Sequence, residues 1–173
     1  FSLALSSGSL GSLLELHLWG NKIGDTGMMA FSTALLGGSL GSLETLLIGG
    51  NQIGDEGIKA FSTALSSGSL ARLKHLDLRL NIICNEGMIA FSEALKPNSN
   101  YPMGARATLE ELWLGCNRIG DEGWKALSTA LSSGALTSLR LLSTYKETPQ
   151  LRDACDARGI ILEQIISLLA DFS

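Results

Sequence analysis

The stretch LETLLIGGNQIGDEG, residues 43–57, decides the fold because it recurs along the chain. Copies of the same frame occupy residues 13–27, 73–87 and 109–123, and an AFSTAL-like segment follows each copy at residues 30–35, 60–65, 90–95 and 126–131. The asparagine of each copy recurs every 30 residues, with one interval of 36, at Asn21, Asn51, Asn81 and Asn117. Self-similarity at a fixed period of this length is the signature of a repeat array.

Each unit is predicted to contain one short strand and one helix. Alternate residues of a strand point to opposite faces, so the L-x-L segment indicates a strand with its leucines inward. The apolar residues of the AFSTAL segment share one helical face. Because a unit can bury its leucines only against its neighbours, the chain is predicted to form an α/β solenoid. Helices are about 10 Å wide and strands about 4.8 Å apart, so we expect a horseshoe segment with parallel strands on the concave face and helices on the convex face.

Polar residues and glycines mark the boundaries within each unit. We expect N-caps at Asp25, Asp55 and Asp121, and left-handed C-caps at Gly38, Gly68 and Gly134. The four asparagines are interpreted as a structural ladder whose side-chain amides satisfy buried backbone groups of the loops.

The pattern L-x-x-L-x-L-x-x-N-x-I-G-D-x-G followed by A-F-S-x-A-L resembles the leucine-rich repeats of the ribonuclease-inhibitor type, which also occur in NACHT receptors and Ran GTPase-activating proteins. The resemblance covers nearly all of residues 1–142. That region is expected to hold about four complete units and to start within a repeat, because FSLAL at residues 1–5 matches only the second half of a unit.

Residues 143–173 are expected to form a degenerate last repeat and a C-terminal cap. The segment from Pro149 predicts a short helix, a stop at Gly159 and a β-branched strand. One apolar stripe then predicts a final helix, with members at Ile161, Ile165, Leu168, Leu169 and Phe172. Such a cap would shield the open edge of the last unit.

Composition narrows the possible functions. With 45% hydrophobic and 17% charged residues among 173, the chain can bury one core and is not disordered. The net charge of -4 argues against a nucleic-acid partner, and no apolar run is long enough for a membrane span. Three scattered cysteines, Cys84, Cys116 and Cys155, favour a reducing compartment, so we expect an intracellular, cytoplasmic protein.

The outward-facing positions of the strands are the candidate functional residues, because the scaffold does not dictate them. Aromatic and charged side chains gather there, and Trp, Tyr and Arg dominate binding energy at protein interfaces. The sequence therefore predicts a partner-binding surface made of His17, Trp19, His75, Asp77, Arg79, Glu111, Trp113 and Tyr145. The partner is expected to be another protein, and the chain is expected to be a non-enzymatic interaction scaffold.

Catalytic and metal-binding arrangements are not expected. Glu15 and Glu111 fall three strands apart, about 14 Å, which is too far for a glycosidase pair. No hydroxyl falls beside His75 and Asp77 to complete a triad, and no phosphate-binding loop occurs. We expect no metal and no cofactor. Two alternatives remain open: a regulator of a small GTPase acting through Arg79, which the resemblance to Ran GTPase-activating proteins implies, and a structural subunit that uses the convex helices or the insertion at residues 96–108.

Overall fold

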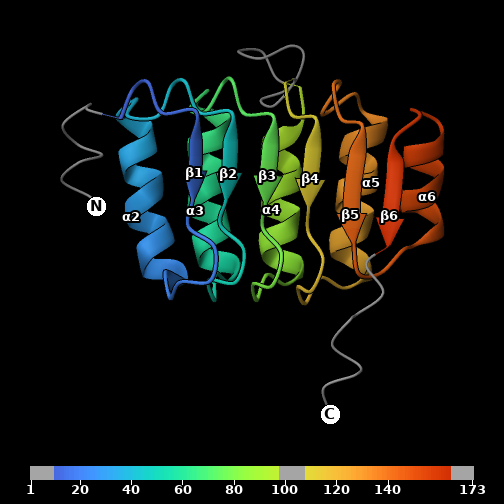
Figure 1. The fold of residues 1–173 in the computed structure, drawn as a ribbon. Coiled ribbons are helices and arrows are strands. Elements are labelled where there is room, and N and C mark those ends of the chain that lie inside the picture. Colours follow the sequence, from blue (N-terminus) through green and yellow to red (C-terminus); the bar gives the residue numbers. More distant parts are fainter. Residues whose placement is uncertain (1–9, 98–107, 165–173) are drawn as a thin grey trace.

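Strands and helices alternate along the chain in the order that the repeat predicts. The computed structural model describes residues 10–97 and 108–164 (Figure 1). Within them the elements are β1 (Glu15–His17), α2 (Gly24–Leu36), β2 (Thr45–Leu47), α3 (Asp55–Ser66), β3 (His75–Asp77), α4 (Asn85–Leu95), β4 (Glu111–Trp113), α5 (Asp121–Ser132), β5 (Leu141–Thr144), α6 (Pro149–Asp156) and β6 (Ile161–Gln164).

The six strands form one parallel sheet in chain order, from β1 to β6. Figure 1 shows the helices as a second layer behind the strands, so each repeat contributes one strand to one surface and one helix to the other. The register places Leu46 of β2 beside Leu16 on one side and Leu76 on the other. The predicted leucine-rich solenoid, with parallel strands on one face and helices on the opposite face, is confirmed.

The core lies between the two layers and runs the length of the array. Leu46, Leu76 and Leu112 of the strands are fully buried, as is Phe61 of α3. Burying a leucine or phenylalanine side chain contributes roughly 1.5–3 kcal/mol. These side chains are covered by adjoining repeats, so the stability of each repeat depends on its neighbours.

The N-cap prediction is wrong for Asp25, Asp55 and Asp121, because each lies within its helix and not before it. The residues that precede α2, α3 and α5 are Ile23, Gly54 and Gly120, and none of them makes a side-chain capping bond. Instead, the Asp25 carboxylate accepts hydrogen bonds from the backbone N–H groups of Gly54 (2.7 Å) and Gly57 (2.9 Å), which begin the next helix. Asp55 accepts from the N–H of Cys84 in the same way (2.7 Å).

Glycine makes this contact between repeats possible. A Cβ at Gly57 would lie 2.6 Å from Asp25 Oδ1, so a larger residue would displace the carboxylate. Asn85 takes the same role in the third unit and accepts from the N–H groups of Gly120 and Gly123. Asp121, the fourth member, pairs with Lys146 at 2.6 Å instead. Each side chain at this position therefore links its own repeat to the following one.

The glycines that follow the helices adopt the predicted left-handed conformation. Their φ angles are +78° at Gly38, +87° at Gly68 and +93° at Gly134. Only glycine reaches this region without steric cost, so these residues let the chain turn back toward the next strand.

The segment that follows β5 forms the predicted short helix, glycine stop and strand. Thr148 caps α6 by accepting from the N–H of Leu151 at 3.2 Å, and Gly159 turns the chain at a φ of +66°. The Arg158 guanidinium donates to the carbonyls at the end of α5 and in the loop that follows it, those of Leu131 (3.0 Å), Ala135 (2.5 Å) and Leu136 (2.7 Å). This arginine therefore ties the last helix–strand unit to the fourth repeat.

The stripe of the final helix is wrong at its first member, because Ile161 begins β6 and is exposed. A parallel pairing with β5 fixes Ile161 in the sheet. The other members, Ile165, Leu168, Leu169 and Phe172, lie outside the described residues, as do the half-unit at residues 1–5 and most of the insertion at residues 96–108. The division of the chain into residues 1–142 and 143–173 stays a prediction.

Candidate functional site

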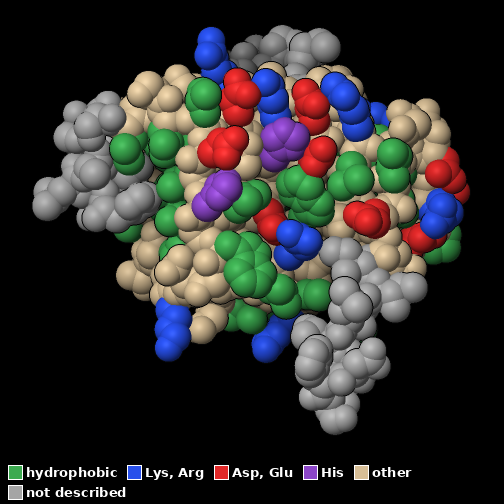
Figure 2. All heavy atoms as spheres, viewed as in Figure 1, with side chains coloured by type: hydrophobic (Ala, Val, Ile, Leu, Met, Phe, Trp, Pro, Cys, Tyr) green, Lys and Arg blue, Asp and Glu red, His purple; other side chains and the backbone are tan. Residues whose placement is uncertain are grey.

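The candidate site is the outward surface of the sheet, called the sheet face below. It comprises the outward residues of β1 to β5, which the register aligns in two rows, and a third row made of the residue two positions after each member of the second row. The rows are Glu15, Thr45, His75, Glu111 and Leu141; His17, Leu47, Asp77, Trp113 and Ser143; and Trp19, Gly49, Arg79, Gly115 and Tyr145. Figure 2 shows this face, with both histidines among acidic, basic and hydrophobic side chains.

Asp77 and Arg79 form a fixed ion pair in the middle of the sheet face. The Asp77 side chain is only 2% exposed, and the Arg79 Nη2 donates to Asp77 Oδ2 at 2.7 Å. The Arg79 Nε and backbone N–H also donate to Asp77 Oδ1, at 3.0 and 2.9 Å. These hydrogen bonds raise the pKa of the Arg79 guanidinium. A two-pronged contact of this kind fixes the plane of the guanidinium.

Asp77 is the buried member of this ion pair. The sequence places it among partner-contacting residues, whereas its carboxylate lies beneath Arg79 and is already engaged. Burial of a charge is tolerated only when the charge is paired, and Arg79 supplies that pairing. Asp77 therefore holds the Arg79 guanidinium in place, and Arg79 presents the accessible part of the pair.

Trp113 lies at the centre of a contiguous group with His75 and Arg79. The rings of His75 and Trp113 stack with centroids 6.3 Å apart and planes at 28°. The Arg79 Cζ lies 5.8 Å from the Trp113 ring centroid, within cation–π range. Glu111, on the same strand as Trp113, has its Oε2 3.5 Å from His75 Nδ1. These contacts hold large side chains in one orientation before any partner arrives.

Trp19 lies next to this group and occupies the space left by a glycine. A Cβ at Gly49 would lie 2.6 Å from the indole Nε1, so the indole lies directly over Gly49. The same Cβ position is 3.0 Å from the backbone oxygen of Arg79, which places Trp19 close to the third strand. Trp19 remains 53% exposed. The glycine therefore seats an aromatic side chain that is still accessible.

The remaining predicted residues lie toward the two ends of the sheet face. His17 is exposed and lies 3.4 Å from Glu15 within β1. Tyr145 follows β5 and is 52% exposed, with its backbone oxygen accepting from Gln164 Nε2. The structure therefore brings His75, Asp77, Arg79, Glu111 and Trp113 into one group, places Trp19 beside it, and leaves His17 and Tyr145 apart.

The asparagines are bonded to loop backbone inside the array. Asn81 Oδ1 accepts from the N–H groups of Asn51 and Ile53, both at 3.0 Å, and its Nδ2 donates to the carbonyl of Leu78 at 3.0 Å. Asn117 Oδ1 accepts from the N–H of Ile83 at 3.2 Å. Asn21, in the first repeat, is exposed and donates to the carbonyl of Leu18 at 2.8 Å. These contacts serve the loops and leave no amide facing the candidate site in the second and third repeats.

The polar side chains of the sheet face, as far as the structure describes them, are arranged for binding and not as a catalytic or metal-binding group. Ser143 is fully buried and in register with Trp113, so the tryptophan stands between this hydroxyl and Asp77. Across residues 10–97 and 108–164 no three His, Cys, Asp or Glu side chains are grouped as a metal site would require. Cys155 is buried in α6, and burial raises the pKa of its thiol to about 11, away from a nucleophilic state.

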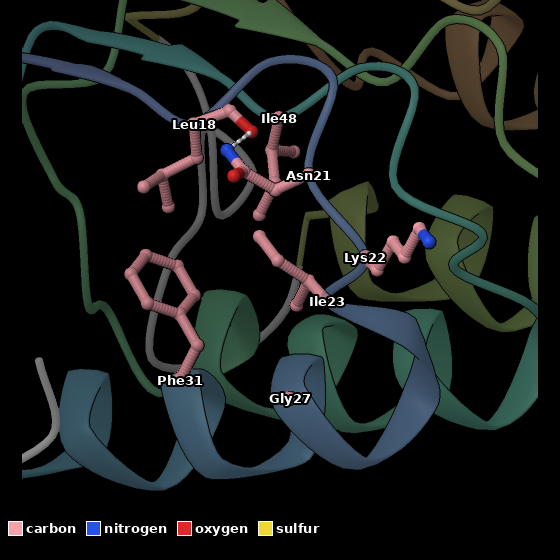
Figure 3. A pocket seen from close by; sticks show the side chains of 7 residues that line it. All are labelled: Leu18, Asn21, Lys22, Ile23, Gly27, Phe31 and Ile48. Carbon is pink, nitrogen blue, oxygen red and sulfur yellow. Dashed lines mark hydrogen bonds between the residues drawn. The ribbon is translucent and has the colours of Figure 1, made fainter.

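A pocket of about 420 Å³ lies in the first repeat, away from the sheet face. Figure 3 shows Leu18, Ile23 and Phe31 around it, between the end of β1 and α2. The equivalent core residues of the second repeat, Ile48 and Ile53, are fully buried beneath the first. Among the described residues the pocket is thus lined by core side chains of the first repeat, with Asn21 and Lys22 as its polar members.

A family model described as "Leucine Rich repeat" matches four segments of the chain, residues 12–32, 42–62, 72–92 and 107–128. Among solved structures, "Leiomodin-1 Actin-Binding Site 2 (ABS2)" is similar to this chain at a TM-score of 0.71 and 16% sequence identity. That match covers 91% of this chain and 84% of the other. No curated protein sequence matches the chain.

None of the helices in the described part of the chain has the length and apolar character needed to span a membrane.

Proposed function

The chain is a leucine-rich repeat protein, and we propose that it is a non-enzymatic scaffold whose sheet face binds a partner protein. Leucine-rich repeats and their structural neighbour support an interaction role in general. The choice of the sheet face, and of the residues on it, is the proposal.

The observation that carries the proposal is the prearranged group of Arg79, Trp113 and His75 with Trp19 beside it. Binding normally costs the entropy of ordering interface side chains, about 0.5–1.5 kcal/mol for each flexible one. Here Asp77 and the stacked ring of His75 already order Arg79 and Trp113. A surface that holds an arginine and tryptophans ready and accessible has the composition of an interface hot spot.

The similar solved structure is consistent with a protein partner. Its title names an actin-binding site, so a solenoid of this shape presents a surface that another protein recognises. At 16% identity the likeness extends to the fold, and the partner of this chain is therefore left as an unidentified protein. The net charge of -4 favours a protein over nucleic acid, and three free thiols favour an intracellular, cytoplasmic setting.

The alternative of a GTPase regulator depends on Arg79. An arginine that acts on a bound nucleotide must reach out of its own protein, whereas Arg79 is held by Asp77 through both its Nε and Nη2. We therefore favour partner docking. A structural subunit that uses the helix layer or the 96–108 insertion is the remaining alternative.

The test replaces Trp19 and Trp113 together by alanine. A partner captured from cells on the immobilised full-length chain should bind this variant at least about tenfold more weakly, a loss of about 1.4 kcal/mol. Helical circular dichroism should stay unchanged, because neither side chain belongs to the buried core.

The matched control replaces Met29 and Leu36, two exposed apolar residues of α2, by alanine. It should retain full affinity. Equal affinity of the tryptophan variant and the wild type would refute docking on the sheet face.

A further inference from the structure

The sheet face carries more negative than positive charge. The pairing of β5 with β6 continues its rows onto β6, and the extended rows hold one guanidinium, that of Arg79, and four carboxylates, those of Glu15, Asp77, Glu111 and Glu163. With histidines counted as neutral, one positive against four negative charges gives -3 on this surface, whereas the whole chain carries -4. The net charge of the protein is therefore concentrated where the proposed interface lies.

The positive charges of this surface are already matched within the chain. Arg79 is held by the buried Asp77 carboxylate at 2.7 Å. Lys74 and Arg140, which directly precede members of the first row, pair with acidic neighbours at 2.8 and 3.2 Å. Arg72 belongs to the loop before β3 and lies outside the rows. An acidic segment of a partner would thus meet carboxylates and no unmatched cation within the rows.

Two of the carboxylates, Glu111 and Glu163, lack a cationic partner. Glu111 lies 3.5 Å from His75, and imidazoles carry little charge at pH 7. Glu163 forms no ion pair with any residue that the structure describes. It lies near enough to Arg79 to add to the effect of Asp77, which is the main cause of the raised pKa of that guanidinium. Because Asp77 already balances Arg79, both glutamates keep an unmatched negative charge.

Aromatic rings lie beside both glutamates. Glu111 and Trp113 are alternate residues of β4, so they share one face about 7 Å apart. Tyr145 is 52% exposed, and its backbone oxygen accepts from the side chain of Gln164, the residue after Glu163. Figure 2 shows acidic and hydrophobic side chains next to one another over this part of the sheet. A carboxylate beside an aromatic ring suits lysine or arginine, because the carboxylate pairs with the cation and the ring face attracts it.

The register joins these residues into one patch across three neighbouring strands. Trp113 pairs with Ser143 and Ser143 with Glu163, so Trp113 and Glu163 lie two strand spacings, about 10 Å, apart. Glu111 is related in the same way to Ile161, which is 64% exposed. The two glutamates therefore occupy opposite corners about 12 Å apart, and the apolar residues Trp113 and Ile161 occupy the other two.

We propose that the acidic patch, made of Glu111, Trp113, Tyr145, Ile161 and Glu163, binds an extended basic segment of the partner protein. In an extended chain, residues four apart point to the same side and lie about 13 Å from each other. Two lysine or arginine side chains at this spacing reach both glutamates, and an apolar side chain midway between them packs on Trp113 and Ile161. This inference rests on the proposed function and names the chemistry of the partner.

The test measures binding of a fluorescent peptide built on Lys-Ser-Phe-Ser-Lys to the full chain by fluorescence anisotropy. Two control peptides replace the lysines by glutamate or the phenylalanine by serine. The Lys–Phe peptide should bind at least about tenfold more tightly than either control, and added salt should weaken its binding.

A pair of double variants separates the acidic patch from attraction by net charge. Glu111→Gln with Glu163→Gln should weaken binding of the Lys–Phe peptide at least about fivefold. Glu122→Gln with Asp153→Asn removes the same charge from exposed positions of α5 and α6, and its binding should stay within about twofold of the wild type. Circular dichroism of both variants should match that of the wild type, because all four changes preserve side-chain shape.

Several outcomes would overturn the acidic patch. They are equal losses in the two double variants, full binding by the Glu111 and Glu163 variant, absence of binding by the Lys–Phe peptide, and binding of either control peptide as tight as that of the Lys–Phe peptide. Failure here with continued loss of the protein partner in the Trp19 and Trp113 variant removes the acidic patch alone. Retention of that partner by the Trp19 and Trp113 variant removes the proposed function itself.

Discussion

Replacing Asn81 by alanine is expected to destabilise the protein by about 3–5 kcal/mol. Its side chain is 4% exposed and bridges two repeats, because its oxygen accepts from the N–H groups of Asn51 and Ile53 while its nitrogen donates to Leu78. Alanine leaves two buried donors without an acceptor, and each such group costs about 1–3 kcal/mol. Urea denaturation followed by circular dichroism measures the loss.

The other ladder positions provide an internal control series. Asn21→Ala should cost less than about 1 kcal/mol, because Asn21 is exposed and the Leu18 carbonyl that it bonds also accepts from Asn51 Nδ2. Asn117→Ala should fall between the two, since its oxygen accepts from one N–H group, that of Ile83. Equal losses at all three positions would contradict a ladder that acts through buried backbone contacts.

Replacing Arg158 by alanine is expected to destabilise the protein by about 3 kcal/mol. The guanidinium donates to three carbonyls at and after the end of α5, those of Leu131, Ala135 and Leu136. Hydrogen bonds from a charged donor are worth about 1.5–3 kcal/mol each before relaxation, and water replaces only part of them. The loss is measured as a shift of the urea midpoint.

Arg152→Ala is the matched control for Arg158→Ala. Arg152 lies in α6 and pairs with Glu147 at an exposed site, where ion pairs contribute little to stability. A clear difference between the two variants would show that the last unit is held to the array by Arg158. Similar small effects would mean that α6 and β6 do not cap the fourth repeat.

The fold could be predicted from the sequence because the constant length of the repeat sets which residues of neighbouring strands pair. The strands begin at equivalent points of each unit, so Glu15, Thr45 and His75 were expected to align, and they do. The additional six residues before the fourth unit leave the register intact, with Glu111 beside His75. Hydrophobic periodicity therefore decided which residues lie inward and which lie on the sheet face.

Contacts between repeats could not be predicted in the same way, because a local pattern does not say which neighbour a side chain meets. Asp25 stands where an N-cap of its own helix is expected, yet it accepts from Gly54 and Gly57 about 30 positions further along. Asp77 is a different case, because its partner Arg79 lies only two residues away, and the sequence does not show that this pair is buried on the Asp77 side.

The sequence predicted which residues of the candidate site share a surface, but not which of them touch one another. The stacking of His75 on Trp113 and the seating of Trp19 over Gly49 depend on rotamers that the alternation of residues does not determine.

Site-directed photo-cross-linking in cells tests most directly whether partners bind on the sheet face. A benzoylphenylalanine at position 145, where Tyr145 is exposed beyond β5, is compared with one at position 125, where Lys125 is exposed on α5. We expect a protein adduct from position 145 that disappears when Trp19 and Trp113 are replaced, and none from position 125. An adduct from position 125 alone would place the interface on the helix layer and contradict the account.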